Sequence, residues 1–417
     1  MKGLKAVLNL LRSERVQDIA DLVLETSFLA FVFLIFFSRR AGDAALILVA
    51  LSWIIRRLAC SPFFPQVPLR LPLLLFLISL LLSSLFAEDL SHSFRDFFSK
   101  APKILVIFFG SLEYLRDRDR YRKLFWVSTW VILLIGADGL VQYLRGYDLI
   151  REAGLWKGRV RAHLGSPAFF EYVLPFLPFS LCLWKEGGNG WKRAFLGVAA
   201  VAFVASALLS QTRSVWIALS LVILFLAAFS RHRIPLLISI ALMILALGML
   251  PMARGRASLF SVRDLISEQK HQRLLAWQIS YRMFLSRPIL GKGVDFFDNY
   301  KRNAQRQRPY LSPSLLEEIA RGGKGIVFPI YHPHSIYLEL LAGQGLVGMA
   351  TFVFILVILL LSLWKKRRGP PLPLLATSAS LLSFLVCGAV GTSFYDFRSF
   401  AMFWLLAGMV MSLEGKE

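Results

Sequence analysis

Long apolar stretches, separated by short polar connectors, follow one another along nearly the whole chain. An α-helix needs about twenty mostly apolar residues to cross a hydrocarbon core of about 30 Å. The pattern therefore predicts an all-α polytopic membrane protein with about twelve transmembrane helices. The predicted spans are residues 22–37, 44–55, 71–86, 104–115, 124–144, 168–183, 194–209, 215–229, 235–252, 346–363, 372–390 and 400–413.

The charges of the connectors predict how these helices are oriented. Short loops rich in Lys and Arg remain in the cytoplasm. The short basic connectors are residues 116–123, 185–193, 231–233 and 365–368. The opposite, non-cytoplasmic face then receives residues 39–44, 88–100, 147–166, 211–213 and 253–333. Both termini are expected in the cytoplasm.

This topology divides the chain into three parts. Residues 1–252 are expected to form an N-terminal transmembrane bundle of about nine spans, preceded by a basic amphipathic helix on the cytoplasmic surface. Residues 253–345 are expected to form a large non-cytoplasmic loop that contains surface helices and a catalytic lid. Residues 346–417 supply the C-terminal spans. Within the loop, residues 272–285 have apolar positions at helical spacing, and residues 303–324 read as a polar flap.

Composition supports the membrane class and exposes one anomaly. The chain is 56% hydrophobic and only 18% charged, which is too apolar for a soluble globular protein. Its net charge of +22 does not indicate nucleic-acid binding, because much of the Lys and Arg lies in the short connectors. The large loop nevertheless carries fourteen Lys and Arg on the face where few are expected. This excess calls for an anionic ligand.

Three cationic or titratable residues are expected to converge on the loop side of the membrane. Arg213 lies between two spans joined by almost no loop, and Arg273 begins the surface helix, one turn before Trp277. His334 opens the segment before the next span, and its neutral imidazole suits a general base. Each residue also has a plainer interpretation. Arg213 could reach lipid headgroups, Arg273 could lie on a polar helix face, and His334 could be structural.

Other candidate groups carry less information. Glu25, Asp138 and Glu171 lie within or beside apolar spans, where ionisable groups indicate function by default, but the sequence does not place them near the three residues above. Asp117 and Asp119 form a DxD pattern inside a basic connector and are interpreted as a solvated, self-paired run. The three cysteines are far apart and indicate neither a disulfide framework nor a metal site.

The segments QTRSVWIAL, RLLAWQISYRMFLSRPILGKG and HSIYLELLAGQGLVG together resemble the O-antigen ligase and polymerase-like superfamily of membrane glycosyltransferases. The resemblance covers roughly residues 159–348. Its most specific part is H-S-x-x-L-E-x-x-x-x-Q-G-x-x-G, which ends in Gly345 and Gly348. The P-x-x-G-x-G piece comprises Pro288, Gly291 and Gly293. RAHLGSP departs from the usual R-x-x-G-T-x-x-N-P, which puts the roles of the arginines around it in doubt.

The resemblance implies a multi-pass protein of the bacterial inner membrane, with the loop of residues 253–345 and the active site facing the periplasm. It also implies which donor is used and how the site residues act on it. Arg213 and Arg273 would hold the diphosphate of an undecaprenyl-diphosphate-linked glycan, and His334 would activate or orient the acceptor hydroxyl. Arg159, Arg161 and His332 are expected to contribute to diphosphate or substrate binding. Guanidinium groups bind diphosphate bidentately and stabilise it as a leaving group. Such a donor requires no cofactor and no metal, and a single displacement would invert the anomeric carbon.

Several functions remain open at this point. A ligase would transfer the finished O-antigen to lipid A–core, and its single dominant loop favours this reading over a polymerase. A polymerase of the same superfamily would transfer the chain to a new lipid-linked repeat unit, and a third variant would glycosylate protein side chains. A transporter of lipid-linked glycan is a different class, and the lack of matching interrupted spans in the two halves argues against it.

Overall fold

The computed structural model describes residues 13–58, 60, 63–187, 190–229, 268–296, 307–313, 316–317, 332–366 and 371–414. The predicted span at 235–252, residues 1–12 and most of the predicted flap at 303–324 lie outside the described residues. Within them the regular structure is helical, apart from two isolated β-bridges in the loop after α6. The all-α prediction is therefore confirmed for the described part of the chain.

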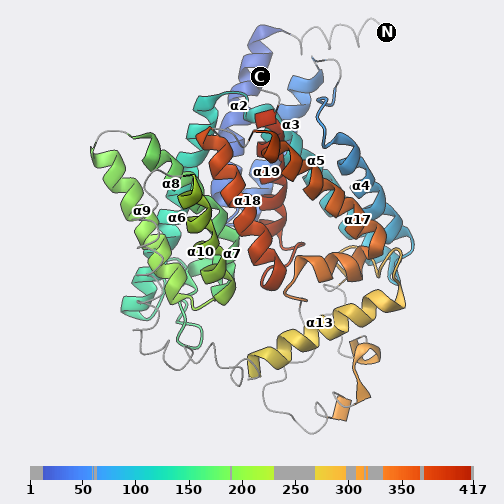
Figure 1. The fold of residues 1–417 in the computed structure, drawn as a ribbon. Helices are drawn as coiled ribbons and strands as arrows, with labels where there is room; N and C mark the ends of the chain where they lie inside the picture. The colour runs from blue at the N-terminus through green and yellow to red at the C-terminus, as the bar shows by residue number, and fades with distance from the viewer. Residues whose placement is uncertain are drawn as a thin grey trace, which may run out of the picture.

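The α-helices form a bundle with one helix, α13, lying across its end (Figure 1). The bundle helices of the first half are α2 (Glu14–Leu34), α3 (Arg39–Leu58), α4 (Arg70–Leu85), α5 (Leu90–Tyr114), α6 (Arg118–Arg145), α7 (Phe170–Val173) and α8 (Leu177–Glu186). The second half supplies α9 (Gly190–Leu209), α10 (Arg213–Ala228), α13 (Glu268–Ser286), α17 (Ile336–Lys365), α18 (Leu372–Val390) and α19 (Phe397–Glu414). Short 3₁₀ turns flank α7.

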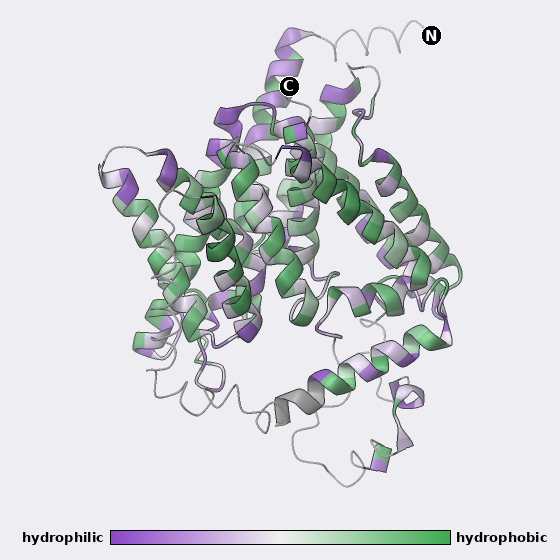
Figure 2. Ribbon diagram, in the orientation of Figure 1, coloured by the Kyte–Doolittle hydropathy of each residue, from purple (hydrophilic) through white to green (hydrophobic). Residues whose placement is uncertain are grey.

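Six stretches of helix are long and apolar enough to cross a membrane. These candidate spans are Arg118–Arg145, Pro167–Glu186, Gly190–Leu209, Ile336–Lys365, Leu372–Val390 and Phe397–Glu414. The helices Arg70–Leu85 and Arg213–Ala228 are apolar but shorter. The hydropathic colouring shows an apolar middle between two polar ends (Figure 2). The described residues thus support an all-α membrane protein, whereas the predicted count of twelve spans is not reached among them.

The predicted connector at 88–100 is mostly helical. Residues from Leu90 onward begin α5, which continues through Pro102 to Tyr114. Asp89 caps this helix by accepting a hydrogen bond from the backbone N–H of His92 at 3.1 Å. The charged residues of the first turns lower the average hydropathy, so a window tuned to membrane spans detects only the apolar second half.

Two ends of the bundle are distinguished below. The terminal face is the end where α2 begins and α19 ends, and the loop face is the opposite end, where α13 lies (Figure 1). α3 and α19 both end at the terminal face, so both begin at the loop face. Small residues let the bundle helices approach closely, as at Gly136, where an added Cβ would meet the backbone of Phe203 at 2.5 Å.

α17 is broken near its start, and the break anchors the large loop. Gly345 has φ 65° and ψ −161°, so the first part of α17 lies crosswise and the rest rises through the bundle (Figure 1). Residues 288–293, which follow α13, pair with the broken segment. The pairing bonds run from Lys292 N to Ala342 O (2.9 Å), Gly293 N to Gly343 O (2.9 Å), Leu346 N to Pro288 O (2.8 Å) and Val347 N to Ile289 O (3.2 Å). Backbone groups freed by the break are thereby satisfied.

The glycines of the two sequence motifs make this pairing possible. Gly291 has φ +70° and Gly293 has φ +117°, conformations that L side chains rarely adopt. An added Cβ on Gly291 would overlap the carbonyl group of Gly343, and one on Gly345 would overlap that of Ile289. The motifs P-x-x-G-x-G and Q-G-x-x-G are therefore the two halves of one backbone junction, which holds α13 against α17.

Candidate active site

The turn that carries Arg213 is braced by Arg159. α9 ends at Leu209 and α10 begins at Arg213, so the predicted tight turn is confirmed. The Arg159 guanidinium donates to Ser210 O at 2.8 Å, to Gln211 O at 3.2 Å and to the Thr212 hydroxyl at 3.0 Å. Gln211 has φ 51°, a strained conformation for a residue other than glycine. Arg159 thus fixes the backbone from which Arg213 projects.

The loop that supplies Arg159, residues 146–165, is organised by polar side chains of α6. The Gln142 amide oxygen accepts from the backbone N–H groups of Arg161 and Ala162, each at 2.9 Å. Asp138 accepts from the backbone N–H groups of Leu149 and His163, each at 2.8 Å. Asp138 therefore lies in a structural network that shapes the loop.

Arg161 is engaged within the same loop. Its Nε donates to Gly154 O at 2.9 Å and its Nη1 to Gly165 O at 3.4 Å. The guanidinium carbon lies 5.5 Å from the ring centroid of Trp156. The guanidinium groups of Arg159 and Arg161 both donate to backbone carbonyls, and their contribution to substrate binding stays a prediction.

Arg273 reaches the site from α13, and its helix is confirmed over Glu268–Ser286. Apolar side chains on the buried face of α13, among them Leu275, Ile279 and Met283, pack against Phe296 in a separate small core. Arg273 is half-buried. Burial lowers the pKa of its guanidinium, the nearby Glu171 raises it, and the nearby Arg213 lowers it. Arg213 and Arg273 are thus neighbours, although sixty positions separate them in sequence.

Glu171 is the carboxylate at the centre of this group. It lies on α7 with 1% of its surface exposed, and it interacts electrostatically with Arg273 and Arg159. The Ser214 hydroxyl, one residue after Arg213, donates a hydrogen bond to it. Its carboxylate also touches Gly391, where an added Cβ would overlap both carboxylate oxygens. The sequence marked Glu171 as an ionisable group in an apolar run but could not place it here.

His334 completes the group from the segment before α17. Its backbone has φ 53°, and its ring packs edge-on against His332 with centroids 3.9 Å apart. Burial, His332 and Arg273 lower the pKa of His334 to about 3, while a hydrogen bond to the backbone of Gly391 opposes this shift. The imidazole is therefore neutral at physiological pH and able to accept a proton.

Gly391, on the connection between α18 and α19, lies next to both Glu171 and His334. It contacts the Glu171 carboxylate and hydrogen-bonds His334 through its backbone. Sequence reasoning missed it, because a single glycine after an apolar run reads as a helix end. The structure therefore brings Arg213, Arg273 and His334 together, with His332 and Arg159 adjacent, around one buried carboxylate.

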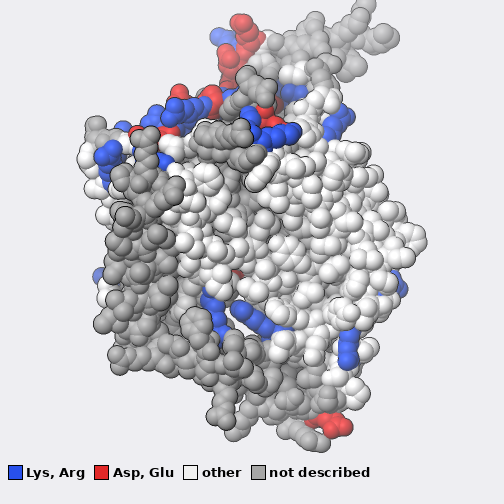
Figure 3. All heavy atoms as spheres, viewed as in Figure 1, with Lys and Arg blue, Asp and Glu red and all other residues white. Residues whose placement is uncertain are grey.

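A hollow opens at the loop face of the bundle, and basic side chains border it on two sides (Figure 3). The wide band above it, on the visible surface, is almost free of charged residues. Cations gathered beside an apolar band suit an anionic group carried by a lipid, because the charge meets the guanidinium groups while the chain stays in the bilayer. Fold and site together define a helical membrane protein with a group of cationic side chains at the loop face of its bundle.

The family model described as O-antigen ligase matches residues 198–353. This match confirms the family resemblance drawn from the sequence. The matched segment contains Arg213, Arg273, His332 and His334, whereas Arg159, Glu171 and Gly391 lie outside it. No curated protein matches the chain.

Proposed function

We propose that this chain is an inverting O-antigen ligase, which transfers a glycan from undecaprenyl diphosphate to lipid A–core. The observation that carries the proposal is the meeting of Arg213 and Arg273 beside His334, from three segments far apart in sequence. Two guanidinium groups match a diphosphate in charge and geometry. A neutral imidazole next to them matches an acceptor hydroxyl.

The reaction would proceed as one displacement. The oxygen of the acceptor hydroxyl forms a bond to the anomeric carbon of the donor glycan as the bond from that carbon to the diphosphate oxygen breaks. The hydroxyl proton passes to His334, and the electron pair of the broken bond leaves with undecaprenyl diphosphate. Arg213 and Arg273 stabilise the charge that develops on this leaving group. Attack from the opposite side of the carbon inverts its configuration.

The lowered pKa of His334 fits this sequence of events. Before donor binds, burial, the neighbouring His332 and the positive charge of Arg273 disfavour the imidazolium form of His334. A bound diphosphate would bring negative charge to the same place and would favour that form. His334 would then gain basicity in the complex, where a base is needed.

Orientation follows from the short basic connectors. The connector between α5 and α6 lies at the terminal face, so the positive-inside rule assigns that face to the cytoplasm. The hollow at the loop face would then open to the periplasm, at the outer boundary of the inner membrane. Lipid-linked donor and acceptor would both reach it from the bilayer.

The ligase is preferred to a polymerase because one dominant loop faces the site side, with a smaller loop at 146–165. A deletion strain separates these two functions on a lipopolysaccharide gel. Bare core with accumulated lipid-linked polymer is expected for a ligase. Core that bears one repeat unit would exclude the ligase and indicate a polymerase.

Reconstitution tests the chemistry directly. Purified protein in detergent is supplied with defined lipid-linked donor and either lipid A–core or a lipid-linked acceptor. Transfer to lipid A–core is expected, with full activity after EDTA treatment. Transfer in detergent, where there is no membrane to cross, would also exclude a transporter. Failure of both acceptors would overturn the proposed function.

A further inference from the structure

A second group of arginines lies at the loop face, outside the site described above. Arg39 is the first residue of α3, Arg151 lies in the loop after α6, and Arg398 is the second residue of α19. Arg398 interacts electrostatically with both of the other two. Arg39 and Arg151 are exposed and Arg398 is half-buried. Three segments distant in sequence therefore bring three positive charges to one place.

Contacts with neighbouring residues locate the group. The guanidinium carbon of Arg398 lies 5.1 Å from the ring centroid of Phe169, and that of Arg39 lies 5.8 Å from the ring centroid of Phe397. Nη1 of Arg151 lies 3.8 Å from the position that a Cβ on Gly165 would take. Residues 165–169 thus contact both Arg151 and Arg398.

The charges of this group are poorly balanced. Asp396 is the carboxylate that acts on both Arg398 and Arg39, and it accepts the backbone N–H of Arg398 at 3.0 Å as the cap of α19. Asp43, near Arg39, is paired with Lys103 at 2.7 Å. In the part of the chain that the structure describes, none of the three arginines makes a salt bridge. Three like charges gathered at a protein surface repel one another unless an anion joins them.

The aromatic neighbours of two of these arginines attract a cation. The π face of an aromatic ring attracts a guanidinium group without offering it an oxygen acceptor. Phe169 lies beside Arg398 in this way, and Phe397 lies beside Arg39. The N–H groups of a guanidinium are the donors that bind phosphate bidentately.

The group is adjacent to the candidate active site. The Thr212 hydroxyl, beside Arg213, donates to Pro167 O at 3.1 Å, so residues 165–169 are tied directly to the Arg213 turn. The connection between α18 and α19 carries Gly391 at one end, in contact with Glu171, and leads to Arg398 at the other. The two cationic groups thus share two chain segments.

We propose that Arg39, Arg151 and Arg398 form a second anion site, which binds a phosphate group of the lipid that carries the acceptor sugar. This inference rests on the proposed function, since a transferase that joins two lipid-borne substrates must hold both at the membrane boundary. Phosphate is the group that membrane lipids present at that depth. The site at Arg213 and Arg273 takes the donor, and the second site orients the acceptor towards it.

The experiment compares two acceptors in the reconstituted transfer assay. One is the phosphorylated acceptor lipid, and the other is the same lipid after enzymatic removal of its phosphate groups. For the wild type we expect a KM about tenfold lower for the phosphorylated acceptor, as loss of a charge-assisted contact of this kind costs about one order of magnitude. Arg398→Gln and Arg39→Gln should remove that preference while the KM for donor stays unchanged. Arg145→Gln, an exposed arginine at the end of α6, is the matched control and should behave as wild type.

Each other result overturns the inference. Equal KM values of the wild type for both acceptors would exclude a phosphate site, and this comparison requires no variant. A variant that loses activity equally with both acceptors would show a structural role, and a changed KM for donor would show a second donor contact. If the wild type transfers nothing, the proposed function fails first. Native mass spectrometry with each lipid then tests the site alone, and equal binding of the two lipids would reject it.

Discussion

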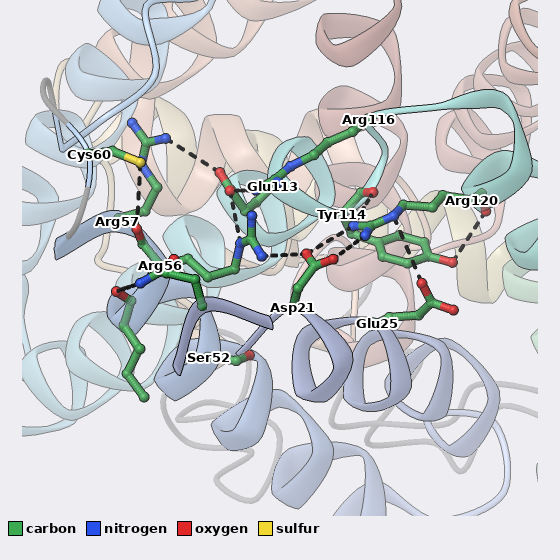
Figure 4. Close-up of polar contacts among 12 residues, drawn as sticks. Asp21, Glu25, Ser52, Arg56, Arg57, Cys60, Glu113, Tyr114, Arg116 and Arg120 are labelled. Carbon is green, nitrogen blue, oxygen red and sulfur yellow. Dashed lines mark hydrogen bonds and ion pairs between the residues drawn. The ribbon is translucent and has the colours of Figure 1, made fainter. Parts of the chain in front are cut away.

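The two ends of the bundle both concentrate charge, but they handle it differently. At the terminal face, α2, α3, α5 and α6 are joined by a network in which every cation meets a carboxylate (Figure 4). Arg56 bridges Asp21 at 2.5 Å and Glu113 at 3.2 Å, and Arg120 also pairs with Asp21. Further pairs are Arg57 with Glu113, Arg116 with Glu113, and Lys123 with Glu25.

At the loop face, cations outnumber carboxylates among the described residues of the candidate active site. Arg273 and Arg159 interact with Glu171, Arg213 interacts with Arg273, and His334 is kept neutral by the same surroundings. Backbone strain accompanies the imbalance, since Gln211 and His334 both have positive φ. The paired charges of the terminal network favour a role in stability, and the excess of cations at the loop face favours the proposed binding of an anion.

The largest expected effect is a loss of transfer activity in variants of the candidate active site at the loop face. Arg213→Ala and Arg273→Ala should each lower kcat/KM for glycan transfer by about 10²–10³-fold, because each removes a donor to the leaving diphosphate. Thermal unfolding in detergent should change little, as each variant also relieves repulsion between the two arginines. Retention of more than a tenth of wild-type transfer by either variant would contradict the assignment.

A variant of the terminal network should lose stability and keep its activity. Arg56→Ala removes the bridge between Asp21 and Glu113 and should lower the free energy of unfolding by about 2 kcal/mol, since these carboxylates lose a partly buried partner. Activity per folded molecule should remain within twofold of wild type. Arg118→Ala is the control, because the side chain of Arg118 is 73% exposed and its pair with Glu186 contributes little. A catalytic defect in Arg56→Ala would break the contrast between the two ends.

Gly391 tests the link between Glu171 and His334. An added Cβ would overlap the Glu171 carboxylate, so Gly391→Ala should lower kcat by about tenfold and stability by about 1–3 kcal/mol. Gly197→Ala is the matched control, because a Cβ there meets nothing within 4 Å. Kinetics and thermal unfolding of both variants are compared. Similar behaviour of the two glycine variants would remove Gly391 from the site.

Glu171 should oppose donor binding modestly. Glu171→Gln keeps a partner for the Ser214 hydroxyl but removes an ionisable carboxyl group close to the proposed diphosphate position. We expect the KM for donor to fall about threefold, a small effect because part of the repulsion is screened. Glu339→Gln removes another buried carboxylate, one that accepts from Ser393 at 2.8 Å, and its KM for donor should not fall. An increased KM in Glu171→Gln would show that Glu171 supports binding.

The smallest effect concerns pH. With the pKa of His334 lowered to about 3, kcat/KM should persist well below pH 6.5 before protonation of the free enzyme reduces it. His332 is a cause of the lowered pKa, so His332→Gln should raise the pKa and move the acid limb to higher pH. A pH–rate profile of both proteins measures the shift. A downward shift would contradict the arrangement of the two imidazoles.

Hydrophobic pattern alone determined the all-α membrane class, the positions of most described helices and the tight turn before Arg213. These features are local, because helix hydrogen bonds are satisfied within each apolar segment. The sequence did not predict that α5 already begins at Leu90, since a helix with a polar first half escapes a test based on average hydropathy. With the help of the family resemblance, the sequence also predicted Arg213, Arg273 and His334 as residues of the active site.

Only the tertiary structure decided what surrounds these residues. It placed Glu171 and Gly391 beside them, and it turned Arg159 and Arg161 towards backbone carbonyls. It showed that Asp138 of α6 holds the backbone of the following loop and that Glu25 belongs to the terminal network. It also showed that the motif glycines join α13 to the break in α17. Such contacts depend on backbone approaches between segments distant in sequence, which no periodicity along the chain encodes.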